Sequence, residues 1–304
     1  MDTIERFRGC LLGLATADAV GTAVEFFVRG SFAPITDMIG GGPFSLKAGE
    51  WTDDTSMALC LATSLTEVGD FDPRDQMRRY LQWYRQGYLS STGRCFDIGM
   101  TVRGALTKYE ATGNPYSGST DPMTAGNGSI MRLAPVAMFY FPHRSRILHY
   151  CAESSRTTHG ATECIDACGL LGDILYRALA GKDKEQVLLG TDPDLLTMAS
   201  LQGIARGEYC DKGEDDIAGT GYVVNSLEAA LWSFWVTDSF PAAILKAVNL
   251  GDDADTTAAV CGQVAGAFYG EKGIPISWLE RLVMCDKIRE LADKIYAKTR
   301  AAYR

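Results

Sequence analysis

The sequence predicts an all-α protein, on three observations. Apolar residues recur at helical spacing in almost every segment, whereas sustained apolar/polar alternation rich in Val, Ile and Thr is hard to find. Of the 304 residues, 46% are hydrophobic, which is ample for a sizeable buried core. No internal repeat, linker or shift in composition divides the chain. We therefore expect one compact, single-domain helical bundle over residues 1–304.

Five helices are predicted in the first half of the chain. The first covers residues 4–19 and turns Phe7 and Leu14 inward. A long loop over residues 27–50, rich in glycine, separates it from the second. Asp72 caps the third, because it precedes a proline that suits the first helical position. The four later helices of this half are predicted at residues 57–68, 73–89, 102–109 and 130–137.

The second half repeats this helical pattern, with one irregular stretch. Residues 181–221 contain two short helices and an acidic loop, and their periodicity is the weakest in the chain. Asp238 or Ser239 is expected to cap the helix that runs to Leu250. Strong apolar periodicity predicts helices at residues 144–156, 160–180, 222–235, 239–250, 256–268 and 278–300.

Two acidic clusters stand just before predicted helices, about 200 residues apart. Residues 52–55 read Thr-Asp-Asp-Thr, and residues 252–257 read Asp-Asp-Ala-Asp-Thr-Thr. One interpretation is an ordinary pair of helix caps, because Asp and Thr suit helix N-termini. However, one cap needs one side chain, whereas adjacent carboxylates repel one another unless a cation relieves the repulsion. The alternative is a divalent metal site, with two ions if the clusters converge.

The chemistry of these clusters narrows the choice of metal. All candidate donors are carboxylate or hydroxyl oxygens, with no Cys or His nearby, which favours Mg²⁺ or Mn²⁺ over Zn²⁺ or Cu²⁺. Cys164 and Cys168 lie four residues apart, but no second Cys/His pair accompanies them, which argues against zinc. Most of the nine cysteines fall on apolar helical faces, as is typical of reduced core residues.

Charge and the N-terminal sequence exclude several classes of function. A net charge of −9 argues against sequence-independent binding to nucleic acid or to an anionic membrane. No apolar stretch reaches membrane-spanning length, and the first residues lack the basic and apolar pattern of a signal peptide. We therefore expect a cytoplasmic protein with no membrane partner.

Two further features point to ligand binding, each with a simpler alternative. Gly126, Asn127, Gly128 and Ser129 precede a predicted helix, so their backbone N–H groups could bind an anion; Asn-Gly is also a common turn. His159 stands at a break between two helices, beside two threonines. A structural histidine is the commoner outcome for such a residue.

In this order, these features resemble the ADP-ribosylglycohydrolase family, including its bacterial arginine-directed members. The resemblance spans nearly the whole chain. Two positions depart from the family pattern, since Ala17 and Asp252 stand where glycine is usual. The matching segments are Arg8-Gly9 to Gly21 with Asp18-Ala19, Thr52-Asp53-Asp54-Thr55, Phe96-Asp97-Ile98-Gly99, Gly126-Asn127-Gly128-Ser129, Thr158-His159, Tyr222-Val223-Val224 and Gly251-Asp252-Asp253-Ala254-Asp255-Thr256.

The resemblance implies a helical bundle around a dinuclear Mg²⁺ or Mn²⁺ site in a central cleft. It implies Asp97 and Glu25 as catalytic residues, with Asp97 the acid/base or ring-contacting group. His159 and Tyr222 would line the distal ribose or adenine end. The diphosphate would face Gly126, Asn127, Gly128 and Ser129. The implied metal ligands are Thr52, Asp53, Asp54, Asp253, Asp255 and Thr256.

The implied function is a metal-dependent hydrolase that removes ADP-ribose from modified proteins, most naturally from arginine. Cleavage of this N-glycosidic bond at C1 of ribose needs an oriented diol, nearby negative charge and an activated water. ADP-ribosylated protein would be the substrate and ADP-ribose the product. The alternatives are another ADP-ribosyl linkage (serine, O-acetyl or nucleic acid), a non-catalytic ADP-ribose binder, and a two-metal phosphoester hydrolase.

Overall fold

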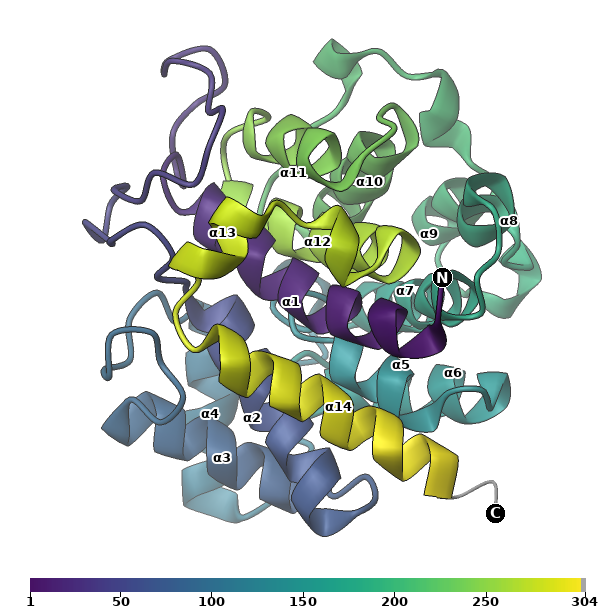
Figure 1. The fold of residues 1–304 in the computed structure, drawn as a ribbon. Helices are drawn as coiled ribbons and strands as arrows, with labels where there is room; N and C mark the ends of the chain where they lie inside the picture. Colours follow the sequence, from purple (N-terminus) through teal and green to yellow (C-terminus); the bar gives the residue numbers. More distant parts are fainter. Residues whose placement is uncertain (302–304) are drawn as a thin grey trace.

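The computed structural model describes residues 1–301, and its regular secondary structure in this range is helical (Figure 1). It contains fourteen α-helices and five short 3-10 helices, and no strand occurs within the described range. The all-α prediction is therefore confirmed. None of the helices in residues 1–301 has both the length and the apolar character that crossing a bilayer requires.

Two helices form the centre of the fold. Helix α1 (Thr3–Gly21) packs along helix α12 (Ala254–Tyr269) in the opposite direction, and the two lie side by side in Figure 1. Glycines permit this close approach, because a Cβ at Gly13 would overlap the carbonyl oxygen of Gly262. A Cβ at Gly21 would likewise overlap the backbone of Asp255. The C-terminus of α1 therefore lies directly against the first turn of α12.

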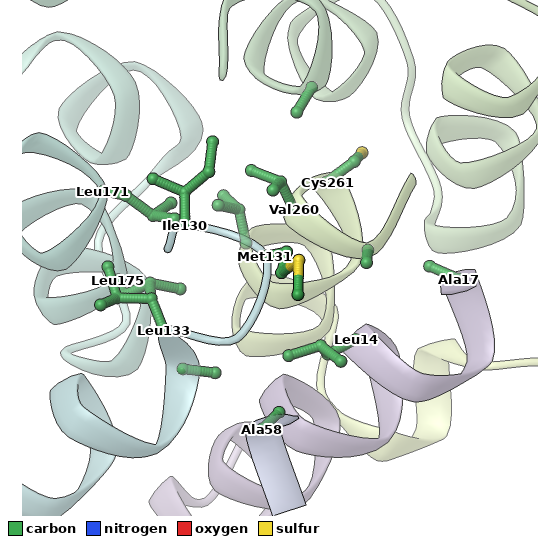
Figure 2. Close-up of a cluster of buried hydrophobic side chains, with 14 of the residues drawn as sticks. Leu14, Ala17, Ala58, Ile130, Met131, Leu133, Leu171, Leu175, Val260 and Cys261 are labelled. Carbon is green, nitrogen blue, oxygen red and sulfur yellow. The ribbon is translucent and has the colours of Figure 1, made fainter. Parts of the chain in front are cut away.

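A third helix brings the other acidic cluster to the same place. Helix α2 (Asp53–Val68) has its N-terminus beside that of α12, and the two helices share one core with α1. Figure 2 shows apolar side chains from five elements meeting there. These side chains are fully buried: Leu14, Ala58, Leu133, Leu171 and Val260.

The other helices pack around this centre. The structure confirms both predicted caps, because Asp72 accepts hydrogen bonds from the backbone N–H groups of Arg74 and Asp75, and Ser239 accepts one from Ala242. The remaining helices of the first twelve are α3 (Pro73–Gln86), α4 (Met100–Thr112), α5 (Ala134–Tyr140), α6 (Arg144–Arg156), α7 (Thr162–Leu179), α8 (Lys184–Leu189), α9 (Ala199–Ala205), α10 (Val223–Trp235) and α11 (Phe240–Val248).

Two helix predictions are corrected. The helix predicted at 130–137 begins only at Ala134, and the residues before it form turns. The last predicted helix, 278–300, is two helices, α13 (Ile276–Arg281) and α14 (Cys285–Ala301). They separate because the backbone N–H of Val283 donates to the carbonyl oxygen of Gly49, and Met284 adopts a left-handed φ of 57°. A contact with the long 27–50 loop thus overrides the apolar periodicity.

Candidate active site

The two acidic clusters meet at the paired N-termini of α2 and α12. The Thr52 hydroxyl lies 3.0 Å from Oδ2 of Asp255, and the Thr256 hydroxyl lies 3.3 Å from Oδ2 of Asp54. These contacts join residues 203 and 202 positions apart in the chain. The prediction that the clusters converge is therefore confirmed. All four side chains are buried, with exposed fractions of 0 to 5%.

Asp18 holds the first of these clusters in place. Its Oδ1 accepts hydrogen bonds from the backbone N–H of Thr52 (3.0 Å) and from its hydroxyl (2.9 Å). Its Oδ2 accepts the same pair from Thr55, at 3.0 and 2.6 Å. Of the three carboxylates around it, Asp18 lies nearest to the Thr52 hydroxyl and can accept its one proton, which leaves the hydroxyl lone pairs for a cation. Asp18 was not predicted as a site residue, although an acid within the apolar second half of α1 was the available signal.

Asn127 supports the second cluster. Its side-chain amide donates to Oδ2 of Asp253 (2.9 Å) and to the Ser226 hydroxyl (3.1 Å). Its backbone N–H donates to Gly221, and that of Gly126 donates to Thr124. The prediction that the backbone N–H groups here bind an anion is therefore wrong for Asn127 and Gly126, whose N–H groups already have hydrogen-bond partners. Helix α5 begins too far along the chain to place its N-terminus at this point. Through these contacts Asn127 orients the Asp253 carboxylate.

Three carboxylates from separate elements converge in the cleft. Glu25 follows α1, Asp97 precedes α4, and Asp255 lies in the first turn of α12. One oxygen from each lies within 4.8 Å of the other two. Asp97 reaches this position with a left-handed φ of 55°, which Asp tolerates better than most residues. The family resemblance implied Glu25 and Asp97 for this site, and the acidic pattern before α12 pointed to Asp255.

The electrostatics of this cluster favour a bound cation. Burial, followed by the charge of Asp97, raises the pKa of Glu25 to about 11. Burial and the charge of Asp253 raise the pKa of Asp97 to about 7. Burial also places the pKa values of Asp54 and Asp255 well above their usual range. Carboxylates so placed ionise together only if positive charge lies between them.

The donor set fits a divalent ion of the Mg²⁺ or Mn²⁺ class. Three buried carboxylate oxygens, Oε2 of Glu25, Oδ1 of Asp54 and Oδ1 of Asp255, have no hydrogen-bond partner among the described residues. Unpaired buried carboxylate oxygens are costly, and a hard cation would satisfy them. The available donors are carboxylate and threonine hydroxyl oxygens, and no sulfur or imidazole donor belongs to the cluster.

The cluster opens into a cleft of about 410 Å³. Thr52, Asp54 and Asp255 lie beneath its surface, since they are buried and do not line it. A second hollow, of about 500 Å³, shares Gly126 with the cleft and continues to Tyr222, which is 41% exposed. The predicted residues that line the main cleft are Glu25, Asp53, Asp97, Gly126, Asn127, Gly128, His159, Asp253 and Thr256.

Ser129 is the predicted substrate-binding residue that the structure places elsewhere. Its side chain is 1% exposed and does not line the cleft. It faces α7, where its hydroxyl lies against the thiol of Cys168. The Ser129 hydroxyl is therefore turned away from the cleft, whereas the neighbouring Gly126, Asn127 and Gly128 line it.

His159 lines the cleft and is held in one tautomer. The buried Arg132 guanidinium donates to the Thr158 hydroxyl (2.6 Å), and Nδ1 of His159 (2.9 Å) is the acceptor that the described residues offer to the hydroxyl's own proton. The imidazole proton then lies on Nε2, which faces Gly126. Burial and the charge of Arg132 lower the pKa of His159 to about 3, so the ring stays neutral. His159 therefore presents a neutral N–H donor to the cleft, and the part that Arg132 plays in orienting it was not predicted from the sequence.

Comparison with known proteins agrees with this geometry. The family model described as ADP-ribosylglycohydrolase matches residues 1–304. The chain is 46% identical over 293 residues to an ADP-ribosylarginine hydrolase Tri1 of Pseudomonas putida, covering 96% of this chain and 78% of that protein. It is 32% identical to the ADP-ribosyl-dinitrogen reductase glycohydrolase of Rhodospirillum rubrum, covering 92% and 91%.

A solved structure extends the likeness to three dimensions. The chain superposes on a protein described as an ADP-ribosylglycohydrolase-related protein complex with a TM-score of 0.86 and 42% sequence identity. The match covers 97% of this chain and 98% of that one. The acidic clusters at the ends of α2 and α12, the cleft above them and these matches lead to one conclusion: the chain belongs to the ADP-ribosylglycohydrolase family.

Proposed function

We propose that this protein is a divalent-metal-dependent hydrolase that releases ADP-ribose from modified arginine side chains of proteins. The observation that carries the proposal is the convergence of Glu25, Asp97 and Asp255 in a cleft above two helix N-termini. The names of the Tri1 relatives, at 46% and 44% identity, support arginine as the linkage. The family match over residues 1–304 supports one domain, and nine free thiols agree with a cytoplasmic setting.

The proposed cofactor is a pair of Mg²⁺ or Mn²⁺ ions. When bound, they would orient the ribose hydroxyls and lower the pKa of an attacking water. Asp18 and Asn127 would keep two of the ligating residues, Thr52 and Asp253, in position through the hydrogen bonds described above. The residues that would hold the ions are Thr52, Asp53, Asp54, Asp253, Asp255 and Thr256.

Asp97 is the proposed acid/base group. Hydrolysis breaks the C1–N bond, forms a bond from C1 to the water oxygen and leaves one water proton to be carried to the departing guanidine. A carboxylate placed beside the scissile bond can accept that proton and return it to the leaving group. Glu25 adds negative charge beside it, which stabilises positive charge as it develops on the ribose ring.

The rest of ADP-ribose would extend away from the acidic cluster. The N–H on Nε2 of His159 can donate to a phosphate or ribose oxygen near Gly126 and Gly128. The adjoining hollow beside Tyr222 has room for the nucleoside end. ADP-ribosylated protein is thus the proposed partner, and the net charge of −9 opposes non-specific binding of nucleic acid.

The test is release of ADP-ribose from defined linkages. Purified protein should release intact ADP-ribose from an arginine-modified protein with Mg²⁺ or Mn²⁺, and chelation should stop it. Asp54→Ala and Asp255→Ala should remove turnover and keep the helical circular dichroism spectrum, because each deletes a repelling carboxylate. Release of AMP, faster release from serine, O-acetyl or nucleic-acid linkages, or ADP-ribose binding without turnover would overturn the proposal.

A further inference from the structure

Three phenylalanines from separate segments form an aromatic rim at the mouth of the cleft. We define the aromatic rim as Phe26, Phe44 and Phe96. The rings of Phe26 and Phe44 lie 6.5 Å apart at 72°, and those of Phe44 and Phe96 lie 5.2 Å apart at 56°. Phe26 directly follows Glu25, and Phe96 directly precedes Asp97. The rim therefore extends outward from the two carboxylates proposed to act on the scissile bond.

The rim is exposed and carries no cation of its own. Phe26 is 63% exposed and lines the cleft, whereas Phe44 and Phe96 are half-buried. No Lys or Arg within residues 1–299 lies over any of these three rings. An exposed aromatic face beside one buried carboxylate (Glu25) and one half-buried carboxylate (Asp97) is a site that suits a cation with a flat surface.

The backbone fixes the position of Phe26. The residue adopts a left-handed φ of 64°, and its N–H donates to the carbonyl oxygen of Asp252 at 2.6 Å. The N–H of Asp252 in turn donates to the carbonyl oxygen of Phe27 at 2.8 Å. A Cβ at Gly251 would lie 2.6 Å from that same oxygen, so the two segments are in tight contact. The loop before α12 thus holds Phe26 in its exposed position.

The shape of the cleft indicates which part of a substrate meets the rim. At Gly126 and Gly221 the cleft continues into the hollow beside Tyr222, whereas Phe26 lines the main cleft and not that hollow. Under the proposed function, on which this inference rests, ADP-ribose occupies the end toward Tyr222. The group attached to C1 of the ribose must then leave past Glu25, Asp97 and Phe26.

We infer that the aromatic rim binds the guanidinium group and adjoining stem of the target arginine, and so selects arginine-linked substrates. The guanidinium stacks on the exposed face of Phe26, and the carboxylates of Glu25 and Asp97 complement its charge. A serine-linked substrate has no cation at this point and gains nothing from the ring face. The rim is thus a specificity-determining surface for an arginine-bearing protein segment.

The test compares two neighbouring phenylalanines. Phe26→Leu keeps an apolar side chain but removes the aromatic face, and it should raise KM for an ADP-ribosylarginine peptide about tenfold, within the range of one cation–π contact. Phe27→Leu is the matched control, because Phe27 is 45% exposed, packs on Phe32 and does not line the cleft. Its KM should match that of the wild type, whereas Phe26→Trp should retain tight binding.

Two further measurements separate the possible failures. Calorimetric affinity for free ADP-ribose should be equal in wild type and Phe26→Leu, because the product lacks the guanidinium. If wild-type protein releases no ADP-ribose from arginine-linked substrate, the proposed function itself fails. If wild type is active and Phe26→Leu has the same KM as Phe27→Leu, or loses affinity for free ADP-ribose equally, the inference about the rim is wrong while the proposed function stands.

Discussion

The carboxylate of Asp18 accepts two hydrogen bonds from Thr55, from the hydroxyl at 2.6 Å and from the backbone N–H at 3.0 Å, and it accepts the same pair from Thr52. A residue near the end of α1 therefore sets the first turn of α2, where the acidic cluster begins. Burial raises the pKa of Asp18 to about 6 in spite of these four hydrogen bonds. Burying the Asp18 carboxylate costs free energy, and this cost indicates that the position of Thr52 matters to the site.

Asp18→Asn should therefore weaken metal binding without unfolding the protein. The amide nitrogen that replaces one oxygen cannot accept from a threonine N–H and hydroxyl, so one pair of hydrogen bonds is lost. We expect Mn²⁺ affinity, measured by calorimetry, to fall about 10- to 100-fold, the usual effect of losing a residue that orients a metal ligand. Asp252→Asn is the control, because Asp252 lies in the second cluster but is not one of the proposed metal ligands, and it pairs with Phe26 and Phe27 through its backbone. Equal losses in both variants would contradict this role.

The stability of the metal-free protein should fall as the pH rises from about 4 to about 7. Asp18 and Asp97, with pKa values raised to about 6 and about 7, hold protons in the folded state that the unfolded chain releases near pH 4. Each such proton lowers the free energy of unfolding by up to about 1.4 kcal/mol per pH unit across this window. Urea unfolding in EDTA at several pH values measures this slope. Mn²⁺ should make this dependence on pH weaker. A free energy of unfolding that increases with pH in EDTA would contradict the prediction.

Asp97→Asn should lower kcat for ADP-ribosylarginine by about 10²-fold or more, because an amide cannot carry the proton. Its affinity for free ADP-ribose should change much less, since the group acts in the transition state. Single-turnover kinetics with an arginine-modified peptide would measure the first effect and calorimetry the second. Full activity of Asp97→Asn, or faster release from serine-linked than from arginine-linked substrate by wild type, would remove Asp97 from the proposed role.

Thr158→Val should release His159 from its single tautomer. The variant removes the hydroxyl that receives the Arg132 N–H and donates to Nδ1, so both neutral forms of the imidazole become populated. Nitrogen-15 chemical shifts of the ring would report the mixture, and affinity for ADP-ribose should fall about tenfold, as for loss of one buried hydrogen bond. Thr157→Val is the control, because the Thr157 hydroxyl also accepts from Arg132 (3.4 Å) but gives its proton to the carbonyl oxygen of Ser154 and not to the His159 ring. An unchanged tautomer in Thr158→Val would contradict the proposal that Arg132, through Thr158, orients His159.

Local signals explain what the sequence could predict. Helices with clear apolar periodicity and a capping residue, such as the one that Asp72 begins, were predicted closely. The acidic clusters were predicted to meet because adjacent carboxylates need a shared counter-charge, and Thr52 and Asp255 do meet. The family resemblance added Glu25 and Asp97, which no local pattern singles out.

What the sequence could not predict depends on contacts between distant segments. The break before α14 arises from the hydrogen bond between the backbones of Val283 and Gly49, and the apolar pattern around residue 283 does not predict it. Asn127 was expected to contact a ligand, but its side-chain amide already donates a hydrogen bond to Asp253, 126 positions away. The orientation of His159 likewise depends on Arg132, whose guanidinium reaches Thr158 only in the folded state.

The glycine contacts between α1 and α12 have a consequence for how proteins of this fold can diversify. Because the two backbones touch at Gly13 and Gly262 with no side chain between them, no compressible layer separates the end of α1, which carries Asp18, from the first turn of α12. The distance between Asp18 and the second acidic cluster is thus set by the main chain. The aromatic rim is carried by loops instead. New leaving-group preferences can therefore arise by exchange of loop residues while the distances that govern catalysis are inherited intact.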